Sequence, residues 1–241
     1  MVKFSRVDPG RFYFMKRLFR TPDISMDRDP ELKEAYKVAV VGCCEGAGAS
    51  FVSSCVLQHG LFEDHTPEGL RTLCETGKGY FYLALGFDKR FAGRDFRDFS
   101  SHGKHELNME LGYNWYVLRP GEGPAEDRDI LRKLYNAAGS FIVYDCSGLI
   151  GRDILWDILG EADRIYLVID PMPTKLISSR GFIDGIRARY PETELVVNRF
   201  AKGIHRGELS KFLETGDYHT LPCVPIEKLY KAEYNCLLAD I

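Results

Sequence analysis

No apolar run in this sequence approaches the roughly 20 residues that are needed to cross a bilayer. The first ten residues, MVKFSRVDPG, also lack the apolar core of a secretion signal, so we expect a cytoplasmic protein. Neither sign of charge is in excess, because 32 Lys and Arg stand against 35 Asp and Glu, a net charge of −3. Since this balance gives no global basic field, we predict no specific nucleic-acid partner.

A disulfide framework and a paired-cysteine metal motif are missing as well. The seven cysteines are odd in number and scattered, and no C-x-x-C spacing occurs. We therefore expect reduced thiols, and we interpret the adjacent Cys43 and Cys44 as buried thiols rather than a redox or metal pair. His102 and His105 lie three apart, but no matching Cys or carboxylate pair is near them, so we interpret them as loop histidines.

The chain divides at about residue 36. Residues 1–36 are expected to form an N-terminal extension, with a basic and aromatic part in residues 1–20 and an acidic linker after it. Residues 1–20 can dock at an anionic membrane surface or in a groove on a partner, or they can pack on their own domain, and we keep these alternatives open. Residues 37–241 are expected to form a single domain.

Apolar, β-branched runs alternate with helical patterns through that domain. The predicted strands are KVAVVG (37–42), YFYLALG (80–86), NWYVL (114–118), SFIVYD (140–145), RIYLVID (164–170), ELVVN (194–198) and YHTLPC (218–223). The predicted helices are residues 49–59, 127–138, 151–161, 174–190, 206–215 and 226–238. Continuous apolar strands alternating with helices indicate a doubly wound α/β domain with a mainly parallel sheet of about seven strands.

The turn after the first predicted strand is rich in glycine. A phosphate-binding loop reads G-x-x-x-x-G-K-[ST], and residues 43–50 read CCEGAGAS, so the first glycine and the lysine are absent. The main-chain N–H groups and the start of the next helix can still converge on an anion there. A dinucleotide-binding fingerprint counted from Gly42 fails, because Cys44 and Ala47 stand where two of its glycines belong.

The loop resembles the deviant Walker A motif K-G-G-x-G-K-[ST] of the ParA/MinD family of ATPases. Gly46, Gly48 and Ser50 match it, whereas Cys44 and Ala49 replace its two lysines. FIVYDCSGLIGRDILWDILGEADRIYLVIDP (141–171), ELVVNRF (194–200) and LPCVPIEKLYKAEYN (221–235) resemble later segments of the family. The degraded loop is most similar to the pilus-assembly branch of the TadZ/CpaE type.

The resemblance implies a P-loop NTPase fold and a set of site residues. Gly46, Ala47, Gly48, Ala49 and Ser50 would cradle the phosphates of ATP or ADP. Ser50 and Asp145 would hold Mg²⁺, with Asp145 as the catalytic switch residue. Asn198 would read adenine, with Arg199 beside it; simple roles as a helix cap for Asp145 and as a turn former for Asn198 stay open. Asp88 is a candidate for the first switch, with a surface-loop charge as the alternative. Asp170 is interpreted as a turn residue at the end of its strand.

Losing both lysines removes the positive charge that stabilises phosphoryl transfer, so we expect hydrolysis to be very slow or absent. Nucleotide binding stays open, because Lys89, Arg90, Arg94 or Lys175 can supply a substitute charge. The resemblance implies a cytoplasmic positioning or assembly factor for a surface or secretion apparatus, acting through protein partners. A homodimer, an active ATPase switch and a scaffold at the inner membrane surface that docks through residues 1–20 are the alternatives.

Overall fold

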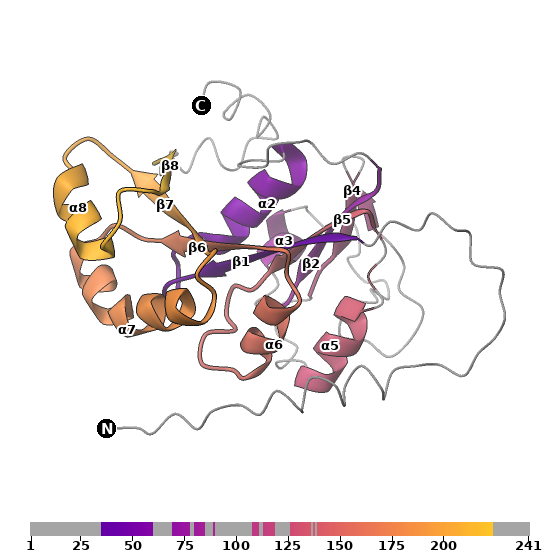
Figure 1. The fold of residues 1–241 in the computed structure, drawn as a ribbon. Helices are drawn as coiled ribbons and strands as arrows, with labels where there is room; N and C mark the ends of the chain where they lie inside the picture. Colours follow the sequence, from indigo (N-terminus) through magenta and orange to yellow (C-terminus); the bar gives the residue numbers. More distant parts are fainter. Residues whose placement is uncertain are drawn as a thin grey trace, which may run out of the picture. The chain divides into compact units, whose positions relative to one another are not determined.

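The computed structural model describes residues 35–59, 69–77, 80–84, 89, 108–110, 113–118, 126–135, 137 and 139–223. Within them, eight strands form one sheet in the order β3-β4-β2-β5-β1-β6-β7-β8 (Figure 1). The strands are β1 (Tyr36–Gly42), β2 (Arg71–Glu75), β3 (Asn108–Glu110), β4 (Tyr113–Tyr116), β5 (Phe141–Asp145), β6 (Arg164–Ile169), β7 (Glu194–Phe200) and β8 (His219–Pro222). Seven strands pair in parallel, and β3 pairs antiparallel with β4 at one edge.

Helices cover both faces of this sheet. They are α2 (Ala49–His59), α3 (Tyr80–Ala84), α5 (Asp127–Tyr135), α6 (Ile154–Gly160), α7 (Pro173–Arg189) and α8 (Arg206–Leu213). Figure 1 shows α2 on one face and α5, α6 and α7 on the other. No helix among the described residues is long and apolar enough to span a membrane.

The central strands are apolar on both sides because both sides are covered. In β1 the four residues Val38 to Val41 are all 0% exposed, and in β6 Tyr166 to Ile169 are as well. Burying each large aliphatic side chain contributes about 1.5–3 kcal/mol, so the sheet centre is the main source of stability. In the sheet, β1 lies between β5 and β6. The glycine-rich loop that follows β1 therefore leaves the carboxyl edge of the sheet between these two strands.

The predicted doubly wound, mainly parallel sheet of the P-loop type is confirmed, with β3 as an additional antiparallel edge strand. One predicted strand is wrong, because Tyr80–Ala84 forms the helix α3, and Arg71–Glu75, which we did not predict, supplies the strand β2. Burial explains the error. Phe81 and Tyr82 are buried while Tyr80 and Leu83 are exposed, a one-sided pattern that a short apolar run does not reveal in the sequence.

The other predicted helices and strands within the described residues are present, with ends that shift by a few positions. The predicted helix 226–238 and the N-terminal extension, apart from Ala35 and Tyr36, lie outside the described residues. The same holds for Asp88, Arg90, Arg94, His102 and His105.

Candidate functional site

The segment between β1 and α2 forms a tight loop with two left-handed glycines. Gly46 has φ 73° and Gly48 has φ 93°. A Cβ on Gly48 would lie 2.2 Å from Asn198 Nδ2, so a larger residue does not fit there. The N–H groups of Gly48, Ala49 and Ser50 donate to no protein acceptor among the residues that the structure describes. These are the groups that a phosphate accepts from at a helix N-terminus, so the main-chain half of a phosphate site is present.

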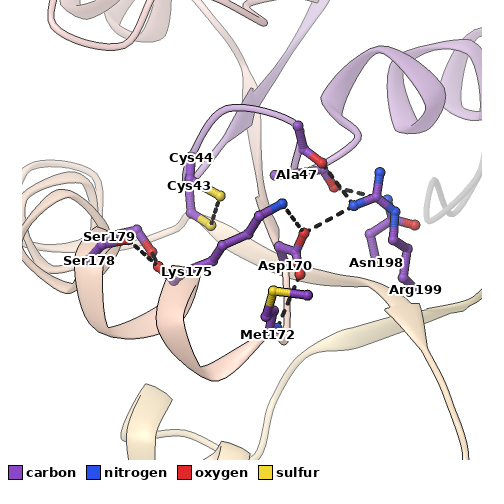
Figure 2. A network of polar contacts seen from close by, with 11 residues as sticks. Cys43, Cys44, Ala47, Asp170, Met172, Lys175, Ser178, Ser179, Asn198 and Arg199 are labelled. Carbon is purple, nitrogen blue, oxygen red and sulfur yellow. Dashed lines mark hydrogen bonds and ion pairs between the residues drawn. The ribbon is translucent and has the colours of Figure 1, made fainter.

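The end of β7 holds this loop from one side. Asn198 Nδ2 donates to the Ala47 carbonyl at 2.9 Å, and Arg199 Nη1 donates to the Gly46 carbonyl at 2.9 Å (Figure 2). Asn198 is buried, and Arg199 has a left-handed φ of 57°, which is uncommon for a residue with a side chain. Both residues that we assigned to the adenine side of the site therefore bind the loop itself.

The buried carboxylate of Asp170, directly after β6, forms ion pairs with two basic side chains beside the loop. Lys175 Nζ donates to Asp170 Oδ2 at 2.7 Å, and Arg199 Nη1 donates to the same oxygen at 3.0 Å. The Met172 N–H donates to Asp170 Oδ1 at 3.1 Å, which is the turn role that we predicted for this aspartate. Figure 2 shows Lys175 reaching from α7 toward Cys44 and the loop. The cluster Asp170, Lys175 and Arg199 is called the cation cluster below.

On the other side of the loop, two serines connect α2 to Asp145. Ser50 Oγ donates to Ser147 Oγ at 3.0 Å, and Ser147 Oγ donates to Asp145 Oδ2 at 3.2 Å. The Ser147 N–H also donates to Asp145 Oδ1 at 3.0 Å. Burial raises the pKa of Asp145 above its ordinary value, and the hydrogen bonds from the Ser147 N–H and hydroxyl lower it in part. The structure thus brings together Ser50 and Asp145, the two residues that we assigned to a metal.

A second buried acid, Glu75, lies next to Asp145. The two residues are paired in register where the neighbouring parallel strands β2 and β5 end. The N–H groups of Phe81 and Leu118 donate to the two carboxylate oxygens of Glu75 at 3.2 and 3.0 Å. Burial, with a smaller contribution from the Asp145 charge, raises the pKa of Glu75 to about 8. Glu75 is therefore mostly protonated at neutral pH.

The turn after β2 touches the turn after β5 on this side. A Cβ on Gly77 would lie 1.6 Å from the Ser147 carbonyl oxygen, so the two backbones approach as closely as glycine allows. Thr76 adds a hydrogen bond to the Asp145 carbonyl at 2.7 Å. The segment after β2 is thereby fixed against the strand end that carries Asp145.

Cys43 and Cys44 begin the loop and remain thiols. Their Sγ atoms are 3.8 Å apart, and both cysteines are free. Burial raises the pKa of Cys44 to about 12, so this thiol is protonated near neutral pH and is a poor nucleophile or metal ligand. The described residues contain no group of three or more His, Cys, Asp or Glu that could hold a metal ion.

This fold has counterparts among solved structures. A chain of a MinC:MinD cell division protein complex from Aquifex aeolicus matches with a TM-score of 0.60, 13% identity, and coverage of 86% of this chain and 89% of that chain. The fold is that of the ParA and MinD ATPases.

Two further structures of this fold agree with the match. A ParA family ATPase from Chlorobium tepidum matches with a TM-score of 0.58 and 13% identity, covering 86% of this chain and 90% of that chain. A plasmid partition protein from Borrelia burgdorferi matches with a TM-score of 0.54 and 16% identity, covering 86% and 98%. No family model matches the sequence. No curated protein matches it either. The structural similarity establishes the ParA/MinD fold, whereas sequence identities this low leave the activity open.

Residues 43–50 of the loop include no lysine or arginine, and the positive charge beside the loop comes from α7 and the end of β7. Of the four basic residues that we named as substitutes, Lys175 lies beside the loop, Lys89 is exposed, and the other two lie outside the described residues. Sequence reasoning missed Glu75 and underrated Asp170. For Asp170 the available signal was its place at the end of the apolar run RIYLVID (164–170). Glu75 likewise ends a strand, RTLCE (71–75), but we did not recognise that strand in the sequence.

Proposed function

We propose that this chain is a ParA/MinD-like P-loop protein of the TadZ/CpaE type that binds adenine nucleotide weakly or not at all. It acts in the cytoplasm as a positioning or assembly factor for a surface or secretion apparatus, through contacts with other proteins. Residues 1–36 form its extension and residues 37–241 its P-loop domain.

The observation that carries this proposal is the support of the loop by protein groups. Asn198 and Arg199 bind the carbonyls of Ala47 and Gly46, so the loop keeps its bend without a bound phosphate. A protein whose loop needs no nucleotide for its shape can present the same surface to a partner whether or not nucleotide is bound.

The electrostatics of the loop argue against efficient hydrolysis. Ala49 supplies no charge to a transferring phosphoryl group, and losing one such stabiliser costs about 2.7–4 kcal/mol in the barrier. The side of the loop that carries Ser50 adds the acids Asp145 and Glu75 instead of a cation. Asp145 favours a bound Mg²⁺, and Glu75 is mostly protonated near neutral pH, so neither stabilises negative charge on phosphate oxygens.

The residues present still fit a nucleotide in part. The unpaired N–H groups at the start of α2 and the two left-handed glycines suit a phosphate, and Ser50 with Asp145 suits Mg²⁺. Asn198 donates one amide N–H to the Ala47 carbonyl, so its second N–H and its amide oxygen are the groups that could contact an adenine edge.

Protein partners are consistent with this fold. One structure that resembles this chain is a complex of MinD with MinC, so the fold carries a partner protein in that case. A homodimer and a contact of residues 1–20 with the inner membrane surface remain parts of the proposal that need their own tests.

Calorimetry tests the proposal directly. Titration of the full chain with magnesium and ATP, and with ADP, should give a dissociation constant of millimolar order or no heat. Phosphate release should stay at the level of an Asp145→Ala control. Turnover that disappears in the Asp145→Ala variant would replace the assembly factor with an ATPase switch.

Co-sedimentation with anionic liposomes at low and moderate salt tests the extension. We compare the full chain with a chain that starts at residue 37. Equal sedimentation of the two would exclude residues 1–20 as a membrane contact.

A further inference from the structure

We infer that Lys175, delivered from α7 and held on Asp170, is the cation of a phosphate site at the glycine-rich loop. The ligand class is a small anion that carries a phosphate or diphosphate group. This inference rests on the part of the proposed function that makes the loop the ligand site, and it goes further by naming the charge that replaces the absent lysines.

Position is the first argument. Lys175 Nζ lies 3.8 Å from the point that a Cβ on Gly46 would occupy, so the ammonium group is next to the exposed part of the loop. Its aliphatic stem runs from the third residue of α7 toward the loop, as Figure 2 shows. An anion bound at the loop on the side of Gly46 would meet a positive side chain that the loop itself does not carry.

Charge is the second argument. Asp170 faces two cations, so the cation cluster keeps one net positive charge after its internal ion pairs. Asp170 is 6% exposed whereas Lys175 is 33% exposed, so the carboxylate is enclosed and the ammonium group is open to solvent. Asp170 is the one hydrogen-bond partner of the Lys175 ammonium group among the described residues, which leaves ammonium hydrogens for a ligand.

The roles of the two cations differ. Arg199 Nη1 is bound to the Gly46 carbonyl as well as to Asp170, so it braces the loop. Lys175 makes no such bond to the loop, and its position is set by Asp170. Because both cations belong to the same chain as the loop, the site is complete in a single copy, and its affinity should not depend on protein concentration.

Inorganic pyrophosphate is the probe, because it carries the phosphate chemistry without a base. Calorimetric titration of the full chain with pyrophosphate should show binding, and Lys175→Ala should weaken it by about tenfold or more, the effect of one charge-assisted hydrogen bond. Lys175→Arg should retain most of the affinity. Lys211→Ala, which removes an exposed lysine of α8, is the matched control and should leave the affinity unchanged.

Lys175→Ala is expected to fold, because Arg199 still pairs with Asp170 in that variant. Lys175→Met, which keeps most of the apolar stem, serves as the second variant if the alanine variant loses its cooperative unfolding transition. Equal pyrophosphate affinity in wild type and either variant would overturn the inference. No pyrophosphate binding by the wild type at millimolar concentration would overturn it too, but would leave the assembly factor that works without nucleotide intact.

Discussion

The buried acid Glu75 gives the sharpest quantitative test of the site. Replacing it by glutamine removes the titration and keeps nearly the same shape. Because burial raises the pKa of Glu75 from 4.5 to about 8, the folded state keeps a proton that the unfolded state releases. The stabilisation from Glu75 is therefore complete below pH 4.5, falls between pH 4.5 and 8, and is lost above pH 8.

The size of the effect follows from the same numbers. Each pKa unit corresponds to about 1.4 kcal/mol, so the change from 4.5 to about 8 amounts to a loss of about 4–5 kcal/mol across the range. Glutamine accepts hydrogen bonds with one oxygen instead of two, so it gives up one of the bonds from Phe81 and Leu118, at a cost of about 1 kcal/mol. The wild type should be the more stable protein at pH 4, and Glu75→Gln should be the more stable one at pH 8.5.

Urea unfolding of both proteins at several values between pH 4 and 8.5 measures this crossing. The difference in unfolding free energy between them cancels the other titrating groups to first order. Glu192→Gln, at an exposed turn, is the control and should run parallel to the wild type. Parallel curves for the wild type and Glu75→Gln would refute the reasoning, because they would mean that Glu75 ionises in the folded state as it does in the unfolded one.

Three further predictions concern the loop and the cation cluster. Gly48→Ala should lower the unfolding free energy by more than about 1 kcal/mol, because its Cβ would meet Asn198 at a left-handed φ. Its control, Gly185→Ala, adds a Cβ in open space in α7 and should raise the unfolding free energy by about 0.5–1 kcal/mol. Thermal unfolding of the two variants and the wild type measures both changes. Asn198→Ala should cost about 1–3 kcal/mol and speed hydrogen exchange in the loop, and unchanged exchange would contradict the bracing role. Asp170→Asn should lower the unfolding free energy in urea by about 1–3 kcal/mol, because it leaves two partly exposed cations without their carboxylate. The loss should be smaller at high salt, and a loss of stability that does not respond to salt would point to packing instead.

The places of the candidate site residues in the fold were easier to predict than their contacts. A glycine pattern after an apolar strand was enough to locate Gly46, Gly48 and Ser50, since left-handed backbone and a helix start leave a local signature. Asp145 was found because it ends a long apolar run. Its buried neighbour Glu75 was missed, since the strand β2 is short and lies in a stretch without a clear period.

Asn198 shows the limit of a resemblance. The motif places Asn198 near the end of a strand, which is β7, but the sequence could not show that its amide would bind the Ala47 carbonyl, 151 positions earlier in the chain. A sequence motif can therefore predict where Asn198 lies in the fold without predicting which group its amide binds.

Local patterns in the sequence determined the architecture: apolar runs of strand length, alternating with amphipathic segments, allow little besides a covered parallel sheet, and the glycines fix the bend of the loop. The tertiary structure decided which charges meet. Glu75 meets Asp145, and Lys175 meets Arg199 on Asp170, because the strand order β2-β5-β1-β6-β7 places their ends side by side. Strand order depends on packing between segments far apart in the chain, so no local pattern encodes it.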